Sequence, residues 1–298
     1  MSSVTVRVPA KINVALSVGP RRADGYHELA TVFHAVSLYD EIIASPDEDI
    51  TVRVEGIGSD RVPLDGANLA VRAAQTLAAY AGVSTGARLH IRKDIPVAAG
   101  LAGGSADAAA ALVACDALWD TGLGRPELSI LAARVGSDVP FGLVGGTALG
   151  TGRGERLTPA MVGGTFHWVL VVAEYGLPAA EVYTTLDDLR GTGVAAPAVV
   201  PDVLAALRAG DAEALGAQLT NDLEPAACTL APQLTATLQA GRDLGALGGV
   251  VSGSGPTCAF LVRDPEHGLD LAVGLTAGQP DADIRRVTGP VPGARIVG

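Results

Sequence analysis

The chain has 298 residues, of which 48% are hydrophobic and 18% are charged, a composition that excludes a disordered protein and allows a large core. The net charge of −11 disfavours nucleic acid and anionic membrane surfaces as partners. No charge-free apolar stretch reaches the ~18 residues that a membrane span needs, and the N-terminus lacks the pattern of a signal peptide, so we expect a cytoplasmic protein. Three cysteines, far apart in the sequence, do not make a disulfide framework.

Alternating and helical patterns of apolar residues divide the chain into short elements. In the first half they predict strands over 4–8, 12–18, 51–56 and 87–96, and helices over 68–82, 105–119 and 126–136. In the second half they predict strands over 166–174 and 284–291, a strand, loop and strand over 248–262, and helices over 179–189, 201–209, 211–223, 231–244 and 266–277. Because strands and helices mix without a regular βαβ period, we predict an α+β fold in two domains, 1–160 and 161–298.

The stretch KDIPVAAGLAGGSADAAAAL (93–112) places a glycine-rich loop between a predicted strand and a predicted helix. A helix N-terminus has backbone N–H groups without intrahelical partners, and glycines let the backbone approach a ligand, so this loop is a candidate phosphate site. The G-x-x-x-x-G-K-[ST] spacing of a Walker A loop is missing. Glycine is common in this chain, with 38 residues, so an ordinary tight turn remains the alternative.

Lys11 and Lys93 are the only lysines among 21 basic residues. Their retention suggests that a compact point charge is needed at both positions, because arginine cannot imitate it; chance is the alternative. Alternation along the first strands places Lys11 and Asn13 on the same face. That face is either exposed, or it is buried and must supply partners for both polar groups.

Further candidates lie in loops. Tyr26 and His27 stand together after an Asp-Gly turn, and Asp138 follows the end of a predicted helix. Ordinary loop packing is the alternative for the first pair and a plain turn for Asp138. Two more glycine-rich loops lie at 150–155 and 252–260.

Three stretches in chain order resemble the motifs of the GHMP kinases, the superfamily of galactokinase, homoserine kinase, mevalonate kinase and phosphomevalonate kinase. They are PAKIN with GYH, IPVAAGLAGGSADAA, and SGSGPT, and the resemblance covers about residues 4–260. It implies a two-lobed α+β fold, with an N-terminal nucleotide-binding lobe and a C-terminal ferredoxin-like α/β sandwich lobe. It also implies an ATP-dependent small-molecule kinase that uses Mg²⁺. The first motif and GSDVPF are most similar to members that phosphorylate the 2-hydroxyl of a diphosphocytidyl sugar alcohol on the non-mevalonate route to isopentenyl diphosphate.

The resemblance also implies a role for individual residues. Asp138 is the expected general base for the substrate hydroxyl, and Lys11 is expected to keep it ionised and to stabilise developing charge. Tyr26 and Tyr183 are expected to cover the two faces of the cytosine, and His27 to bond with its edge. The other expected substrate contacts are Asn13, Gly253 and Gly255. The expected nucleotide contacts are Asn68, Lys93, Pro96, Val97, Ala98, Ala99, Gly100, Leu101, Ala102, Gly103, Gly104, Ser105 and Asp107, with Ser105, helped by Asp107, as the candidate Mg²⁺ ligand.

The chain departs from the family loop at Ala102 and Ala106, where members often have glycine and serine. Ala102 would be strained if its position needs a positive φ, and Ala106 leaves one hydroxyl fewer near the phosphates. The alternatives to this kinase are a sister GHMP kinase, a non-catalytic nucleotide-binding protein on the same fold, and an oxidoreductase using GTGRGE, whose spacing does not fit a dinucleotide site. We expect a monomer or weak homodimer, with neither nucleic acid nor a membrane as partner.

Overall fold

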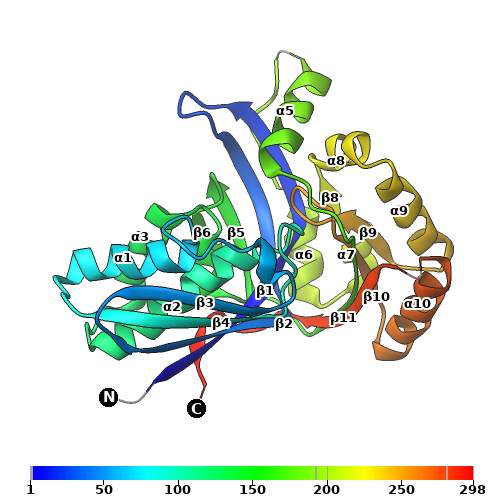
Figure 1. The fold of residues 1–298 in the computed structure, drawn as a ribbon. Coiled ribbons are helices and arrows are strands. Elements are labelled where there is room, and N and C mark those ends of the chain that lie inside the picture. The colour runs from blue at the N-terminus through cyan, green and yellow to red at the C-terminus, as the bar shows by residue number, and fades with distance from the viewer. Residues whose placement is uncertain (1–2, 192, 200, 280, 298) are drawn as a thin grey trace.

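The structure is a computed structural model that describes residues 3–191, 193–199, 201–279 and 281–297. Within these residues the strands form two sheets (Figure 1). The larger sheet has the order β12-β1-β2-β4-β3, with β5 on β2, β6 on β5 and β8 on β1. Its strands are β1 (Val4–Arg21), β2 (His27–Asp47), β3 (Ile50–Gly56), β4 (Gly86–Lys93), β5 (Thr147–Gly152), β6 (Arg156–Pro159), β8 (Thr220–Asn221) and β12 (Arg295–Ile296).

The smaller sheet is antiparallel, with the order β11-β7-β10-β9. Its strands are β7 (Phe166–Val172), β9 (Gly248–Val251), β10 (Cys258–Val262) and β11 (Asp283–Gly289). Numbered from β7, the strands lie in the order 4-1-3-2, and helices connect the first to the second and the third to the fourth. This is the ferredoxin-like arrangement, so the expected C-terminal architecture is confirmed.

Helices cover both sheets. Beside a 3₁₀ turn at Ser59–Arg61 they are α1 (Leu69–Ala81), α2 (Gly103–Trp119), α3 (Arg125–Val135), α4 (Val139–Val144), α5 (Ala179–Arg190), α6 (Pro201–Ala209), α7 (Ala212–Gly216), α8 (Glu224–Leu230), α9 (Gln233–Asp243) and α10 (Pro265–Gly278). In Figure 1, α1 to α3 lie over the larger sheet and α8 to α10 lie beyond the smaller one. In the described part of the chain, no helix is long and apolar enough to span a membrane.

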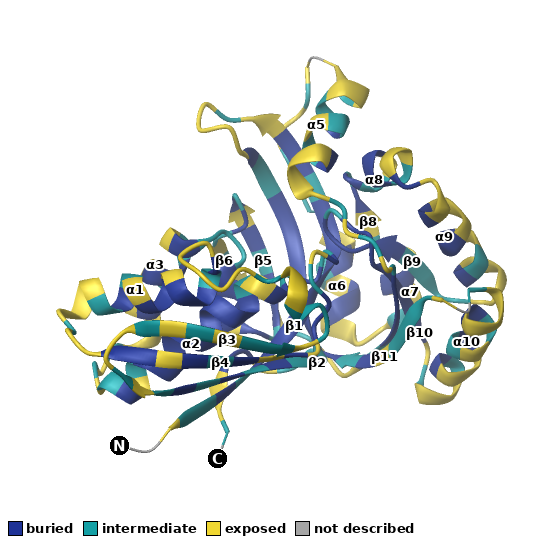
Figure 2. Cartoon of the chain, in the orientation of Figure 1, coloured by how far each residue is buried: buried dark blue, intermediate teal, exposed yellow. Residues whose placement is uncertain are grey.

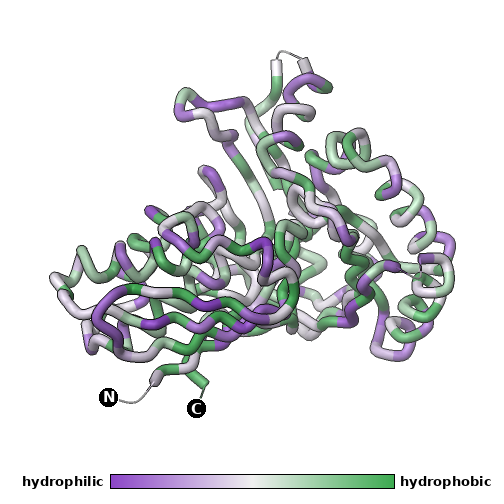
Figure 3. Tube along the Cα trace, in the orientation of Figure 1, coloured by the Kyte–Doolittle hydropathy of each residue, from purple (hydrophilic) through white to green (hydrophobic). Residues whose placement is uncertain are grey.

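A long hairpin of β1 and β2 forms the spine of the molecule. The prediction of two short strands over 4–18 was wrong, because β1 continues through Pro9, and β2 was not predicted. The pairing register shifts between Pro9 and Ala10, so the strand bends at this irregularity and does not end. One end of the hairpin rises beyond the sheet toward α5 (Figure 1). Its middle is buried (Figure 2) and its tip is exposed and hydrophilic (Figure 3).

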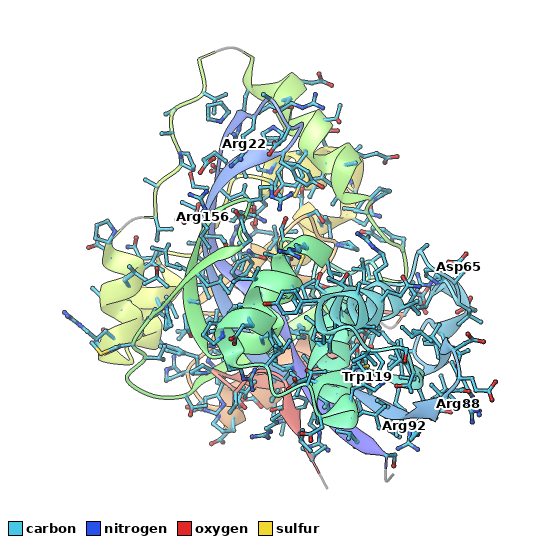
Figure 4. All side chains as sticks on the ribbon, turned by 90° about the vertical axis from the view of Figure 1, so that its left-hand side faces the viewer. Arg22, Asp65, Arg88, Arg92, Trp119 and Arg156 are labelled. Atoms are coloured by element: carbon cyan, nitrogen blue, oxygen red, sulfur yellow. The ribbon has the colours of Figure 1, made fainter. Side chains whose placement is uncertain are left out.

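The β4 strand shows the predicted alternation. Leu89 and Ile91 are fully buried, while Arg88 and Arg92 are exposed and pair with carboxylates of neighbouring strands. Figure 4 shows both arginines at the opposite end of the molecule from Arg22, which belongs to the turn of the β1–β2 hairpin. The arginines therefore lie on a solvated face of the sheet, away from the hairpin tip.

The β7 strand is buried on both faces, which explains the continuous apolar run in its sequence. Trp168 and Leu170 point into the core that the larger sheet shares with α1 to α3, whereas Val169 and Val171 point into a second core beneath α5, α8, α9 and α10. The larger core thus continues from one sheet to the other. The domain boundary at residue 160 stays a prediction: the chain changes sheets between β6 and β7, but β8 and β12 return to pair with β1.

The helix predicted over 211–223 was wrong. The chain forms only the short α7 there, followed by a two-residue strand, β8, that pairs in parallel with Ala15 and Leu16 of β1. Local apolar spacing favoured a helix, but pairing with β1 overrides it. The segment that begins with β8 forms hydrogen bonds with a loop of the candidate site, as described below.

Candidate active site

A cavity of about 700 Å³ opens between the β1–β2 hairpin, the loop before α2, the start of α4, the helix α5 and the loop after β9. It collects residues from widely separated parts of the sequence. Lys11, Asn13, Asp138, Tyr26, His27 and Tyr183 all line it. The cavity therefore brings together the candidate polar residues of the first strand, the turn after α3 and the hairpin tip.

Lys11 and Asn13 lie side by side on β1, as the alternation predicted, and both are buried. The Lys11 Nζ donates a hydrogen bond to Asn13 Oδ1 at 2.6 Å and another to the carbonyl of Gly100 at 3.0 Å. Asn13 Nδ2 donates in turn to Thr31 Oγ1 on β2 at 2.8 Å. These bonds hold the ammonium in one position. Because both side chains are buried and have polar partners, the alternative that this face is exposed to solvent is wrong.

Asp138 provides a carboxylate opposite this ammonium. Its Oδ2 lies 3.9 Å from Lys11 Nζ, and its side chain is 33% exposed, toward the cavity. Burial lowers the pKa of Lys11, and the charge of Asp138 opposes that shift. The pair thus joins a desolvated ammonium to an accessible carboxylate.

The glycine-rich loop before α2 forms one wall of the cavity. Its wall residues are Ala98, Ala99, Gly100, Ala102, Gly103, Gly104 and Ser105. The first intrahelical bond runs from the Ala106 N–H to the carbonyl of Ala102, which leaves the N–H groups of residues 103–105 without intrahelical acceptors. Ala102 has φ 57°, so the family's glycine position does require a left-handed backbone, and alanine adopts it here.

A second glycine-rich loop, between β9 and β10, touches the first. The Ser252 hydroxyl donates to the carbonyl of Gly100 at 3.1 Å. A Cβ on Gly100 would lie 2.2 Å from the Ser252 carbonyl oxygen, and one on Gly253 would lie 3.1 Å from Lys11 Nζ. Only glycine allows these approaches, so both loops and Lys11 form one packed unit. Gly255, with φ 79°, does not line the cavity.

Six of the expected nucleotide contacts lie outside the cavity wall: Asn68, Lys93, Pro96, Val97, Leu101 and Asp107. Asn68 instead caps α1, because its Oδ1 accepts from the Ala70 N–H at 2.9 Å. Lys93 is buried beneath the loop, where its Nζ donates to both Asp40 and Asp107, the latter at 2.8 Å. Desolvation raises the pKa of Asp107 well above its usual range. Lys93 and Asp107 therefore belong, with Asp40, to a buried ion cluster beneath the loop.

Aromatic side chains line the hairpin end of the cavity. His27 stacks on Tyr183 with ring centroids 5.0 Å apart, and its Nε2 lies 2.8 Å from Asp187 Oδ1. Tyr26 is half exposed, and the Arg153 guanidinium lies 4.8 Å from its ring centroid. Tyr26 and Tyr183 both line the cavity, as expected, but in this structure Tyr183 covers His27.

Sequence reasoning missed the segment TNDLEP (220–225), which holds the second glycine loop in place. Asn221 donates to the carbonyls of Val251 and Gly253, each at 2.7 Å, and Glu224 accepts from the Val251 N–H at 2.9 Å. Burial raises the pKa of the Glu224 carboxyl. The cluster of Asn, Asp and Glu residues was the available signal, but we assigned most of this segment to the helix predicted over 211–223.

The stretch at 150–155 forms the antiparallel turn from β5 to β6, not a dinucleotide site.

Comparison with known proteins agrees with this geometry. The family models for the GHMP kinases N terminal domain and the GHMP kinases C terminal match residues 68–146 and 203–277. The chain is 55% identical to the 4-diphosphocytidyl-2-C-methyl-D-erythritol kinase of Thermobifida fusca, with 99% of each chain covered. It is 51% identical to the enzyme of that name from Mycobacterium bovis, over 99% of this chain and 93% of the relative.

Solved structures give the same result. A crystal structure of 4-(cytidine 5'-diphospho)-2C-methyl-D-erythritol kinase superposes with a TM-score of 0.77 at 35% identity, covering 95% of this chain and 98% of that one. A homoserine kinase from Cytophaga hutchinsonii superposes with a TM-score of 0.80 at 20% identity, covering 100% and 98%, and supports the fold alone. The chain belongs to the GHMP kinases and, within them, to the family of the 4-diphosphocytidyl-2-C-methyl-D-erythritol kinases.

Proposed function

We propose that this protein transfers the γ-phosphate of ATP to the 2-hydroxyl of 4-diphosphocytidyl-2-C-methyl-D-erythritol. One observation carries the proposal: a single cavity holds the Lys11–Asp138 pair between a loop of free backbone N–H groups and an aromatic end. The names of the full-length relatives supply the substrate. The reaction belongs to the non-mevalonate route to isopentenyl diphosphate, and we place the protein in the cytoplasm as a monomer or weak homodimer.

Asp138 is the general base in this proposal. An alcohol is a poor nucleophile at neutral pH, and a positioned carboxylate accepts its proton as the bond to phosphorus forms. Lys11, whose Nζ lies 3.9 Å from Asp138 Oδ2, stabilises negative charge that develops on the transferred group. Asn13 and the Gly100 carbonyl hold that ammonium in place.

The loop over residues 98–105 receives the nucleotide phosphates. Phosphoryl transfer depends on positioning and charge neutralisation, and backbone N–H groups at the start of α2 supply both without a lysine in the loop. The described residues hold no group of three or more metal-binding side chains. Mg²⁺ usually arrives with phosphates and takes one or two protein ligands, and Ser105, which lines the cavity at the start of α2, fits that need. The ion would neutralise phosphate charge. Asp107 pairs with Lys93 and does not line the cavity, so the proposal does not use it as a metal ligand.

The test is ADP release from the purified protein with ATP, Mg²⁺ and the diphosphocytidyl substrate. Turnover of mevalonate or homoserine in place of that substrate would support a sister kinase, and ATP binding without turnover of any of them would support a non-catalytic protein. The variant Asp138→Asn should retain ATP affinity and lose at least about 100-fold in kcat, because general-base catalysis contributes 10²–10⁴-fold. Unchanged kcat would exclude Asp138 as the base.

A further inference from the structure

The histidine at the hairpin tip is held by two residues of one helix face. Tyr183 and Asp187 are four residues apart on α5, so their side chains point the same way. Tyr183 stacks on the His27 ring with an interplanar angle of 21°, which sets the plane of the imidazole. Asp187 Oδ1 lies 2.8 Å from His27 Nε2, which sets its rotation within that plane. The ring is therefore fixed before any ligand arrives.

This contact also selects the tautomer of the imidazole. The Asp187 carboxylate is 37% exposed at the edge of the cavity, and an ionised carboxylate can only accept hydrogen bonds. Nε2 must therefore carry the hydrogen. In a neutral imidazole the other nitrogen, Nδ1, is then an acceptor with a free lone pair.

Nδ1 is the nitrogen left for a ligand. His27 lines the cavity, and within the described residues Nδ1 forms no hydrogen bond. It is also absent from the fully buried polar atoms that lack a partner, so the protein does not seal it off. A group bound beside the hairpin tip must present a donor to this atom, because an acceptor would face its lone pair.

The two pyrimidines differ at this point. Cytosine carries an exocyclic amino group, which donates, where uracil carries a carbonyl, which accepts. We propose that Asp187 determines base specificity by fixing the tautomer in which His27 Nδ1 accepts from the cytosine amino group. Uracil would place its carbonyl oxygen against the same lone pair. This inference rests on the proposed function, since it assumes that the cytidine end of the substrate lies at Tyr26, His27 and Tyr183.

The competing explanation is that Asp187 only anchors α5 to the hairpin. An anchor contributes to the binding of both pyrimidine substrates, whereas a tautomer selector contributes to the ratio between them. The ratio of kcat/KM for the cytosine substrate to kcat/KM for its uracil analogue therefore separates the two. Asp187→Ala removes the acceptor, and Asp187→Asn offers an amide that can donate or accept. Asp187→Glu keeps a carboxylate, and Asp188→Asn, at the neighbouring exposed position, is the matched control.

We expect the Ala and Asn variants to lower that ratio by about 10- to 100-fold, the range for one mispaired buried polar group. Asp187→Glu should keep most of the ratio, and Asp188→Asn should leave it unchanged. Equal losses on both substrates, with the ratio preserved, would overturn the inference and leave Asp187 as an anchor.

Nitrogen NMR of the imidazole side chains reads the tautomer directly, and the chain has only five histidines to assign. The wild-type spectrum should show a protonated Nε2 and an unprotonated Nδ1 for His27, and the Nδ1 signal should move more on addition of CDP than of UDP. A protonated Nδ1, or equal responses to CDP and UDP, would overturn the inference. If the wild-type protein phosphorylates neither substrate, the proposed function fails by itself, and these spectra still test the tautomer.

Discussion

The buried lysine beneath the phosphate loop provides a sharp test of the site. Lys93 was expected at the nucleotide, but its side chain is only 1% exposed and contacts two carboxylates that are 0% and 5% exposed, those of Asp40 and Asp107. Asp40 also accepts from the N–H groups of Asp94 and Ile95, at 2.7 and 2.9 Å. The cluster thus ties β2, the end of β4 and the start of α2 together on both sides of the loop.

Replacing Lys93 with methionine keeps most of the length of the side chain and leaves two buried carboxylates without a cation. Breaking a buried ion pair in this way costs about 3–5 kcal/mol, a large part of the 5–15 kcal/mol that stabilises a typical domain. Asp107→Asn should cost less, because desolvation raises the pKa of the Asp107 carboxyl and Lys93 keeps Asp40 as its partner. The double variant should regain part of the loss, because it buries one uncompensated charge fewer.

Urea unfolding followed by circular dichroism gives the free energy of unfolding of the four proteins, and the ATP dependence of turnover gives the KM of those that fold. Lys93→Met should lower the unfolding free energy by the stated amount. The reasoning would be refuted if Lys93→Met unfolds within about 1 kcal/mol of the wild type while the KM for ATP rises tenfold or more. That result would support the expected contact between Lys93 and the nucleotide.

Three further predictions concern stability, and each is measured by urea unfolding. Gly100→Ala should cost about 2–4 kcal/mol, because its Cβ would meet the Ser252 carbonyl at 2.2 Å and its φ is +77°. Gly104→Ala, whose Cβ would meet only Leu69 Cδ1 at 3.6 Å, is the control, and equal losses would contradict this reasoning. Ala102→Gly should stabilise the protein by about 1 kcal/mol by relieving a left-handed alanine; a loss of stability would show that the loop is unstrained. Burial lowers the pKa of His34 to about 4, below its ordinary 6.5, so the unfolded chain takes up the proton first as pH falls through this window. Stability should drop by about 2 kcal/mol between pH 7 and pH 5, and His34→Gln should lose that part of the pH dependence.

Local sequence predicted the elements whose patterns agree with their final surroundings. The α1 helix has its cap at Asn68 and its glycine stop at Gly82, and both signals operate within a few residues. The β4 strand alternates because one face is solvated. The prediction failed for the segment over 211–223, where pairing with β1 overrides the apolar spacing. It also failed for β2, because residues 30–36 of this strand are continuously buried and show no alternation.

The residues alone specify the chemistry available to this protein: two lysines, a glycine-rich loop before a helix, and the motifs that resemble one kinase superfamily. The sequence placed both lysines on strands and predicted both at the site, Lys11 beside Asp138 and Lys93 at the nucleotide, so it did not separate a cavity lysine from a buried one. In the folded chain, burial and contacts distinguish the two lysines. Lys11 faces Asp138 across a cavity, whereas Lys93 is enclosed between two carboxylates. Contacts such as His27 with Asp187 join residues 160 positions apart, and only the folded chain brings them together.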